Sequence, residues 1–388
     1  MKNIVIVMYM GPTGLGVLRS LGKQGIRAYG LDWNPDAPGF YSKFCKRKLV
    51  FPNPLEDSDK FVRQLIDLAN QQERPMILMP AADYYVSLIS RHAEELSGLF
   101  LFNIPKPAIL ESIVDKNSQF ELAKANDIPA PGTFSPASIN ELDAHEKSLH
   151  FPVLVKGAVA DQWQTVFKEK GFVAKNLEEL KEYYNLTAEK KIRIVVQEII
   201  QGPNKNHYKV CAYYSNEHKL LGIFSTQKTR QLPIDFGIGS YMTSVYDEEL
   251  ITLGRKFFEG IAYTGVGSIE FKRDDRDGKL KLIELNPRFW QQNMQATIAG
   301  VNFPYINYLD CLGMTVEPRL SFENGVGWLD IWADIRSFRA HRRKDGISMA
   351  NWLRSVFQAR SFSSYASNDL RPFFHELSTM FKYYLNRF

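Results

Sequence analysis

A hairpin-like segment near residue 270 constrains the fold more than any other part of the chain, because charged side chains interrupt two otherwise apolar runs there. Residues 266–271 form a strand-like run, and residues 273–278 form a polar, charged turn. A second alternating run, 279–286, stops at Pro287. This order of runs and turn predicts a β-hairpin.

The second run of the hairpin has two faces, because successive side chains of a strand point in opposite directions. Glu284 and Asn286 are expected on one face. Ile283 and Leu285 are expected on the other face, toward a core.

The length of the turn decides which face Glu270 shares. A two-residue turn ending at Gly278 would pair Glu270 with Leu285 and place the two acids on opposite faces. A three-residue loop, 276–278, would pair Glu270 with Glu284, and Gly278 supplies the left-handed residue with which such loops end. We therefore expect the two carboxylates on one face, with Cβ atoms about 4.5–5.5 Å apart.

Glu270, Glu284 and Asn286 together predict a metal site. Like charges at directly opposed positions repel, so the pair requires a cation. An all-oxygen site suits Mg²⁺, which usually binds one or two carboxylates together with substrate phosphates. Arg288, two residues farther on, offers a positive fork for a phosphate or a carboxylate. The alternative interpretation is a solvated hairpin with scattered charges.

Length and composition favour an ordinary enzyme of two or three domains, with 388 residues, of which 45% are hydrophobic and 23% charged. The net charge of +5 does not argue for a nucleic-acid partner. Cys45, Cys211 and Cys311 lie far apart, so neither a disulfide framework nor a zinc site is expected, and a reducing, cytoplasmic compartment is favoured. No apolar run approaches the ~18–20 residues of a membrane span, so no transmembrane segment is expected.

The first 110 residues predict a doubly wound, Rossmann-like α/β sheet. The continuous apolar run 4–10 is typical of a strand buried on both faces, and a glycine-rich turn, 11–16, leads into a helical pattern. The next strand, 26–31, ends at Asp32, where a dinucleotide fold would carry its ribose acid. The first strand–turn–helix of any doubly wound sheet also needs small residues, and we adopt this interpretation over nicotinamide binding. Asp83, after a later strand, is interpreted as a helix cap or as a ligand-binding residue.

Motifs farther along the chain resemble, in their order, the ATP-grasp superfamily. Asp115 and Lys116 precede a helical run, residues 151–156 form an apolar strand that ends in a lysine, and residues 193–200 form a second strand. The Glu-Leu-Asn-Pro-Arg sequence at 284–288 is most similar to the branch of carbamoyl phosphate synthetase and biotin carboxylase. The stretch 227–237, which we expect to be too irregular for a strand, resembles a pattern in uncharacterised carboligases related to D-aspartate ligase.

The resemblance implies roles for an ordered series of residues. ATP would be held by Lys116, Lys156, Glu198 and Ile200. Two Mg²⁺ ions, with Mn²⁺ as a substitute, would be held by Glu270, Glu284 and Asn286. The reacting groups would be held by Arg288, Lys228 and Arg230.

The resemblance also implies a fold, an α/β structure with a Rossmann-like domain at 1–110 in front of a two-lobed ATP-grasp domain at 111–310. The small lobe with the adenine linker would span 111–200, and the large lobe with the metal hairpin 201–310. A mainly helical extension would follow at 311–388.

The implied activity is that of an ATP-dependent ligase, which activates a carboxylate as an acyl phosphate and joins it to an amine, with release of ADP and phosphate. The substrates would be small molecules, and the relatives suggest precursors of the cell envelope or of polysaccharides. The alternatives are a kinase or carboxylase of the same superfamily, a nucleotide-binding regulator without turnover, and an NAD-dependent oxidoreductase. The oligomeric state is not indicated.

Two regions depart from the superfamily pattern. The loop expected to close over the phosphates contains no glycine between residues 158 and 170, but it contains Trp163 and Phe167. Closure by aromatic packing and ordering on binding both stay open. The ribose contact is unassigned, with His207 as a candidate.

The last ~75 residues are harder to interpret from sequence. Residues 326–335 are rich in tryptophan and are read as a strand, residues 336–344 are basic, and residues 349–357 and 373–388 predict helices. The final helix is interpreted as a packing helix, with peripheral membrane contact as the alternative.

Overall fold

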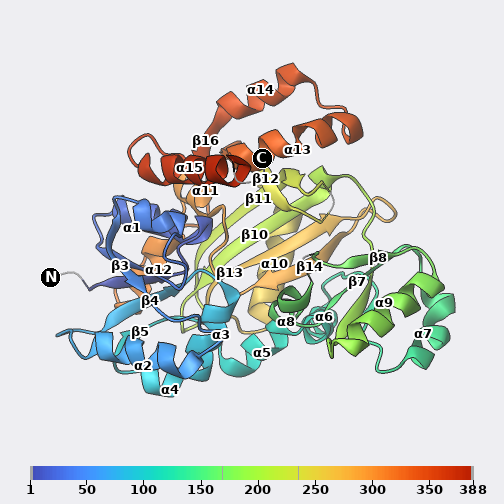
Figure 1. Ribbon diagram of the computed structural model, residues 1–388, viewed down its shortest axis with the longest axis horizontal. Helices are drawn as coiled ribbons and strands as arrows, with labels where there is room; N and C mark the ends of the chain where they lie inside the picture. The colour runs from blue at the N-terminus through green and yellow to red at the C-terminus, as the bar shows by residue number, and fades with distance from the viewer. Residues whose placement is uncertain (1–2, 168, 235, 386–388) are drawn as a thin grey trace.

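The computed structural model describes residues 3–167, 169–234 and 236–385, which form three β-sheets. The N-terminal sheet lies at one end of the molecule and a small sheet at the other, with a large sheet between them (Figure 1).

The N-terminal sheet is parallel throughout, in the order β3-β2-β1-β4-β5. Its central strand β1 is buried at every position, as expected of a strand covered on both faces. The predicted doubly wound arrangement is confirmed. The strands and helices are β1 (Val5–Met8), α1 (Pro12–Gly22), β2 (Ala28–Asp32), β3 (Cys45–Val50), α2 (Ser58–Ala69), β4 (Met76–Pro80), α3 (Asp83–Arg91), α4 (Ala93–Leu96) and β5 (Phe100–Leu101).

The glycines of the first turn are required by packing. A Cβ atom on Gly14 would lie 1.8 Å from the carbonyl oxygen of Tyr9, and one on Gly16 would lie 2.8 Å from the side chain of Asn293. The missing Cβ atoms therefore let α1 pack closely against its strand and against the large lobe, as the packing interpretation predicts.

Asp32 also has a structural role. Its carboxylate accepts hydrogen bonds from the backbone N–H groups of Met10 at 2.6 Å and Asn34 at 2.9 Å, and its side chain is buried. The acid that a nicotinamide nucleotide would use is therefore already bonded within the N-terminal sheet.

The small sheet is antiparallel, in the order β6-β9-β7-β8. Asp115 caps the helix in front of it by accepting a hydrogen bond from Ser118 N at 3.0 Å, which places Lys116 in the first turn of α6. The elements are α5 (Pro107–Val114), α6 (Lys116–Ala125), β6 (Thr133–Phe134), α7 (Ile139–His145), β7 (Val153–Gly157), α8 (Ala160–Val166), β8 (Phe172–Ala174), α9 (Leu177–Glu189) and β9 (Ile194–Glu198).

The large sheet has the order β14-β13-β10-β11-β12-β15-β16. Its last two strands come from the C-terminal extension, so the boundary expected at residue 310 cuts through the sheet. The elements are β10 (His207–Tyr214), β11 (Leu220–Leu232), β12 (Ile238–Ser244), α10 (Glu248–Gly260), β13 (Gly265–Arg273), β14 (Leu280–Asn286), α11 (Asn293–Ile298), α12 (Phe303–Cys311), β15 (Gly327–Leu329) and β16 (Ala359–Phe362).

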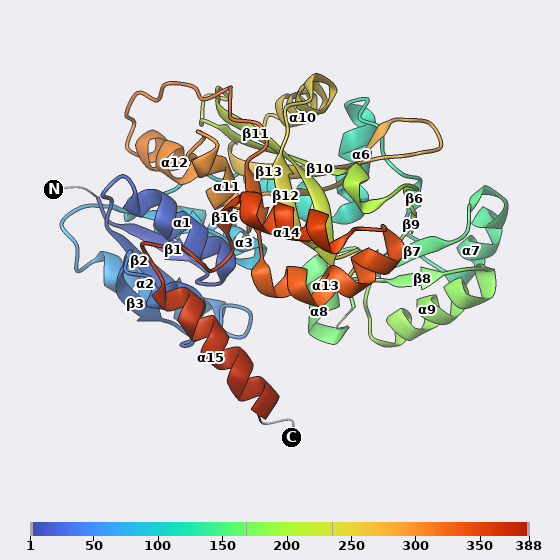
Figure 2. The same cartoon turned by 90° about the horizontal axis from the view of Figure 1, so that it is seen from above.

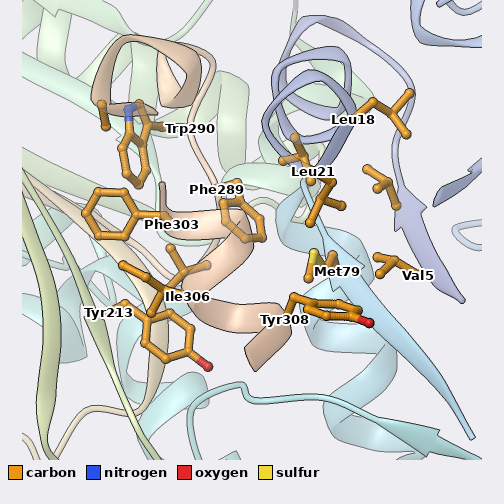
Figure 3. Close-up of a cluster of buried hydrophobic side chains, with 14 of the residues drawn as sticks. Val5, Leu18, Leu21, Met79, Tyr213, Phe289, Trp290, Phe303, Ile306 and Tyr308 are labelled. Carbon is orange, nitrogen blue, oxygen red and sulfur yellow. The ribbon is translucent and has the colours of Figure 1, made fainter. Parts of the chain in front are cut away.

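A continuous hydrophobic core joins the N-terminal domain to the large lobe (Figure 3). Side chains of β1, α1 and β4 meet side chains of the segment that follows the hairpin, so this contact fixes the N-terminal domain against the large sheet. The labelled members are Val5, Leu18, Leu21 and Met79 on one side, and Tyr213, Phe289, Trp290, Phe303, Ile306 and Tyr308 on the other.

The C-terminal extension adds α13 (Ile331–Lys344), α14 (Met349–Gln358) and α15 (Arg371–Leu385), which lie on one side of the molecule (Figures 1 and 2). The basic stretch 336–344 belongs to α13, and the strand expected at 326–335 is limited to β15. The predicted final helix corresponds to α15, although residues 386–388 lie outside the described part. Within that part, no helix is both long enough and apolar enough to span a bilayer.

Candidate active site

A cavity of about 750 Å³ opens where the three sheets meet. Its lining includes Tyr9 and Asp83 from the N-terminal domain, Lys156 from the small lobe, and Glu270 and Glu284 from the large lobe. Most of the residues proposed from the sequence line this one cavity, although they are far apart in the chain.

The hairpin carries its two acids on the face that lines the cavity. Glu270 on β13 is directly opposite Glu284 on β14, as predicted, and Ser268 is opposite Asn286. Glu284 and Asn286 both line the cavity, so they share a face as the alternation of β14 predicts.

The route to this register differs from the prediction. Asp274 N donates to Lys279 O at 2.9 Å, and Gly278 N donates to Asp274 O at 2.8 Å, so the loop contains four residues, 275–278. Gly278 has the expected positive φ of 71°. A β-bulge at Ile283 then restores the pairing of the two acids.

Because of the same bulge, the prediction that Ile283 points toward the core is wrong. Its side chain lines the cavity, whereas Leu282 and Leu285 are in the core. The extra residue reverses the alternation on one side of the bulge, which periodicity alone does not reveal.

Three cationic or polar side chains surround Glu270. Lys209 Nζ lies 3.0 Å from its Oε1, and His207 Nε2 and Lys228 Nζ lie 2.7 and 3.5 Å from its Oε2. Burial opposes ionisation of Glu270, but Lys209, Lys228 and His207 outweigh it and hold its pKa well below the ordinary value. Burial lowers the pKa of His207 to about 4, so it is a neutral partner of Glu270 and not the free ribose ligand considered from the sequence.

Lys209 was not identified from the sequence. It is paired with Glu270 across β10 and β13, so Lys209, Glu270 and Glu284 form one row across three strands. The signal was present in β10, where His207 and Lys209 alternate with apolar residues and so share a face.

Glu284 has a separate cation. Lys116 Nζ lies 3.5 Å from its Oε2, and Asn286 Nδ2 donates to its Oε1 at 3.2 Å. Burial would raise the pKa of Glu284, but Lys116 together with Lys170 and Lys156 lowers it to about 2. Separate lysines thus offset part of the repulsion expected between the two acids.

The donor set suits magnesium. Two ionised carboxylates and an amide oxygen lie on one face of the hairpin. Among the described residues, no three His, Cys, Asp or Glu side chains gather closely enough to hold a metal ion by themselves. A hard cation here would therefore take further oxygen ligands from a phosphate or from water, as Mg²⁺ commonly does.

Lys156, the last residue but one of β7, has its ammonium in the cavity wall. Its Nζ donates to Gln197 Oε1 at 2.7 Å and lies 5.7 Å from the ring centre of Phe120. Burial, reinforced by Lys116, lowers its pKa to about 7. An anion beside Lys156 would restore its charge.

Glu198 and Ile200 line the same cavity at the end of β9. The carboxylate of Glu198 accepts hydrogen bonds from Arg276 and from Gly132 N, the latter at 3.2 Å. Lys272 Nζ donates to the carbonyl oxygen of Ile200 at 2.8 Å. Both groups expected to recognise adenine thus have protein partners that a base would have to replace or share.

Arg288 links the hairpin to the N-terminal domain. Its Nε donates to Asp83 Oδ2 at 2.9 Å, and its Nη1 donates to Phe289 O at 3.0 Å. Asp83 is not a helix cap, because Ala82 holds that position without a side-chain hydrogen bond; instead Asp83 lines the cavity and orients the guanidinium.

The side chains of Lys228 and Arg230 point to different places, so the prediction that Arg230 holds a reacting group is wrong. Residues 220–232 form a strand after all, and a bulge at Thr229 interrupts its alternation. Lys228 and Gln231 line the cavity, whereas Arg230 is absent from its described lining. Instead, Arg230 makes two 2.8 Å hydrogen bonds to Asp334 of α13 and stacks on Tyr241.

The glycine-free segment after β7 forms the short helix α8. Trp163 is 2% exposed and its ring lies 4.5 Å from that of Phe167. A Cβ on Gly157 would lie 2.6 Å from that of Trp163, so this glycine permits the close approach. Aromatic packing therefore holds the segment over the cavity, where Lys170 also lies.

The arrangement of sheets and cavity defines a class of protein, the ATP-grasp fold. The N5-carboxyaminoimidazole synthetase of Staphylococcus aureus superposes with a TM-score of 0.65 at 15% identity, over 84% of this chain and 82% of that one. The biotin carboxylase domain of the 2-oxoglutarate carboxylase of Hydrogenobacter thermophilus, solved with MgADP, ADP and bicarbonate, superposes with a TM-score of 0.66 at 18% identity, over 84% and 73%. These likenesses establish the fold and confirm the α/β architecture expected from the sequence.

Within that class, the chain is similar in sequence to the D-aspartate ligase of Enterococcus faecium. The two are 27% identical over 281 residues, which span 69% of this chain and 66% of the relative. No model of a known protein family matches the sequence.

Proposed function

We propose that this protein is an ATP-dependent carboxylate–amine ligase. The main support is the row formed by Lys209, Glu270 and Glu284, which combines a pair of carboxylates for a metal with a cation for phosphate in one cavity. The similarity to D-aspartate ligase supports the same reaction class. The domain boundary expected at residue 110 is retained in this proposal, whereas the ATP-grasp domain would extend past residue 310 to include β15 and β16 of the large sheet.

ATP would lie between the small and large lobes. Lys116 and Lys156 would hold its phosphates, and the chain around Glu198 and Ile200 would contact its base. Glu270, Glu284 and Asn286 would hold one or two Mg²⁺ ions, or Mn²⁺ in their place. When bound, such a metal would neutralise charge on the phosphates.

The substrate carboxylate would attack the γ-phosphorus of ATP, forming a new P–O bond as the bond to ADP breaks. An amine would then attack the carbonyl carbon of the acyl phosphate, release phosphate, and lose a proton to give the amide. Lys228 and Arg288 would stabilise the negative charge that spreads over the transferred group. Arg230 takes no direct part, because Asp334 already occupies its guanidinium.

The acceptor would lie beside the N-terminal domain, where Asp83 faces Arg288. One substrate is proposed to be an amino acid, on the strength of the D-aspartate ligase relative. The other would be a precursor of the cell envelope or of a polysaccharide, and the reaction would take place in the cytoplasm.

A hydroxamate screen tests the proposal. Hydroxylamine replaces the amine and traps an acyl phosphate, so the purified protein with MgATP and a panel of amino acids and sugar acids should form hydroxamate with the true carboxylate alone. Arg288→Ala should lower the rate of that reaction far more than the affinity for ATP, because its charge matters most in the transition state.

A carboxylase is the second candidate, because a structural neighbour was solved with bicarbonate and ADP. ADP release that depends on bicarbonate, without any organic carboxylate, would favour it. Transfer of the phosphoryl group to a hydroxyl would indicate a kinase, and tight ATP binding without ADP release would indicate a regulator.

A further inference from the structure

The three helices of the C-terminal extension expose large apolar side chains. Phe357 at the end of α14 is 84% exposed, and Phe374 and Phe381 on α15 are 57% and 61% exposed. Ile335 on α13 is also exposed. Phenylalanine side chains are normally among the most buried in a folded protein, so their gathering in one extension requires an explanation.

On α14 the exposed apolar residues form a stripe. Met349, Leu353 and Phe357 follow one another at a spacing of four, which places them along one face of the helix, and all three are exposed. The adjoining face of the helix contacts the protein, where Trp352 Nε1 donates to Asp334 at 2.8 Å and Val356 packs against the core. The helix is therefore held in place with its apolar stripe directed outward.

Helix α15 likewise has one face that packs against the protein and one face that is exposed. Phe373 turns inward, where its ring stacks on Trp332 at a centroid distance of 5.8 Å. Phe374 and Phe381 lie seven residues apart, two helical turns, on the outward face. Both helices lie on the side of the molecule that faces the viewer in Figure 2.

Basic side chains accompany these apolar residues. The exposed ones on the three helices are Arg336, Arg339, Arg342, Arg343, Lys344, Arg354, Arg371 and Lys382. Within the described part of the three helices the acids are Asp334, which is buried against Arg230, and Glu376, which is partly buried. The exposed charge of these three helices is therefore positive.

We propose that this side of the extension docks on the surface of an anionic lipid bilayer, with α14 and α15 lying in the interface. Bulky apolar residues beside arginine and lysine are the combination that interfacial helices use, the apolar groups entering the acyl boundary and the cations meeting lipid phosphates. A second copy of the chain fits less well, because a two-fold interface would bring two positive faces together. The docking does not depend on the proposed ligase reaction.

Sedimentation of the full chain with large vesicles tests the docking. The protein should sediment with vesicles that contain phosphatidylglycerol, sediment little with pure phosphatidylcholine, and be released as salt increases. Phe357→Ser should weaken binding about tenfold, since it removes a phenyl group from the acyl boundary. Arg354→Glu should weaken it at least about fivefold.

Matched substitutions on the small lobe provide controls. Leu186→Ser and Lys190→Glu change an exposed leucine and an exposed lysine at the far end of the molecule, and both should bind vesicles like the wild type. Melting temperatures confirm that all variants are folded. The absence of sedimentation with phosphatidylglycerol vesicles at low salt would overturn the proposal, as would equal losses in both sets of variants. Dimerisation that Phe357→Ser abolishes, without vesicle binding, would assign the face to a second copy instead.

Discussion

Glu270 on β13 is directly opposite Glu284 on β14, and each carboxylate has its own lysine. Lys209 lies 3.0 Å from Glu270, and Lys116 lies 3.5 Å from Glu284. The cavity therefore keeps two ionised acids side by side without a metal. If a metal bound to the acids, Lys209 and Lys116 would be free to pair with the phosphates of the nucleotide instead.

Removing one of these acids should uncouple metal from nucleotide. In the wild type, ADP with Mg²⁺ should raise the melting temperature a few degrees more than ADP alone, because tighter ligand binding stabilises the folded state. In Glu284→Gln the two shifts should be equal, whereas Glu217→Gln, a surface control, should behave like the wild type. Equal shifts in the wild type, measured by thermal denaturation, would contradict the metal site.

The buried lysine at the end of β7 should make ATP binding depend on pH. The pKa of Lys156 is lowered to about 7, so the free protein loses this proton as the pH rises through that value. Phosphate favours the charged form, so the affinity for ATP should fall by up to about tenfold for each pH unit above 7, with proton uptake on binding. Calorimetry in buffers of different ionisation enthalpy measures the uptake.

Lys156→Met is the matching variant. It should bind ATP about 10- to 150-fold more weakly at acidic pH, the loss of one charge-assisted hydrogen bond, and its affinity should no longer change in this window. A variant that keeps the pH dependence would assign it to another group.

The lysine missed in the sequence should control ionisation of Glu270. Lys209→Met removes the cation that does most to hold the pKa of Glu270 low, so that pKa should rise toward neutrality. At acidic pH, where Lys156 is still protonated, affinity for MgADP should then fall as the pH is lowered, whereas the affinity of the wild type should stay constant over that acidic range. Titration of binding against pH checks this, and an unchanged profile would argue that Lys228 and His207 suffice.

Substitution of Arg230 should mainly reduce stability, whereas substitution of Lys228 should mainly reduce activity. Arg230 and Asp334 have side chains only 3% and 1% exposed, so Arg230→Met leaves a buried carboxylate unpaired and should cost about 3–5 kcal/mol of unfolding free energy. Lys228→Met should instead lower turnover with a smaller loss of stability. Urea denaturation and ADP release, measured on both variants, would contradict the assignment if Arg230→Met stayed fully stable but inactive.

The sequence was sufficient for the doubly wound N-terminal sheet and for the face shared by Glu284 and Asn286. These depend on a continuous apolar run and on simple alternation, which are local properties. The opposition of Glu270 and Glu284 was also predicted, but from a three-residue loop, whereas a four-residue loop and a bulge at Ile283 produce it. The loop is one residue longer than predicted and the bulge adds one residue to β14, so the two differences cancel in the register.

The placement of Arg230 could not be obtained in the same way. It follows Lys228 by two residues, so alternation places both on one face, and only the bulge at Thr229 turns Arg230 toward α13. Bulges depend on how neighbouring strands pair, and those partners lie far away in the chain. Lys209 was missed for the opposite reason, because its partner Glu270 lies 61 residues on and becomes visible once β10 and β13 are paired.

Isotope transfer tests the proposed reaction most directly. Once the hydroxamate screen has identified the carboxylate, that substrate is labelled with oxygen-18 in its carboxyl group and converted with MgATP and the amine. An acyl phosphate intermediate leaves one of those oxygens on the released phosphate, so mass spectrometry should find labelled phosphate in proportion to the amide formed. Amide formation with unlabelled phosphate would contradict the proposed mechanism.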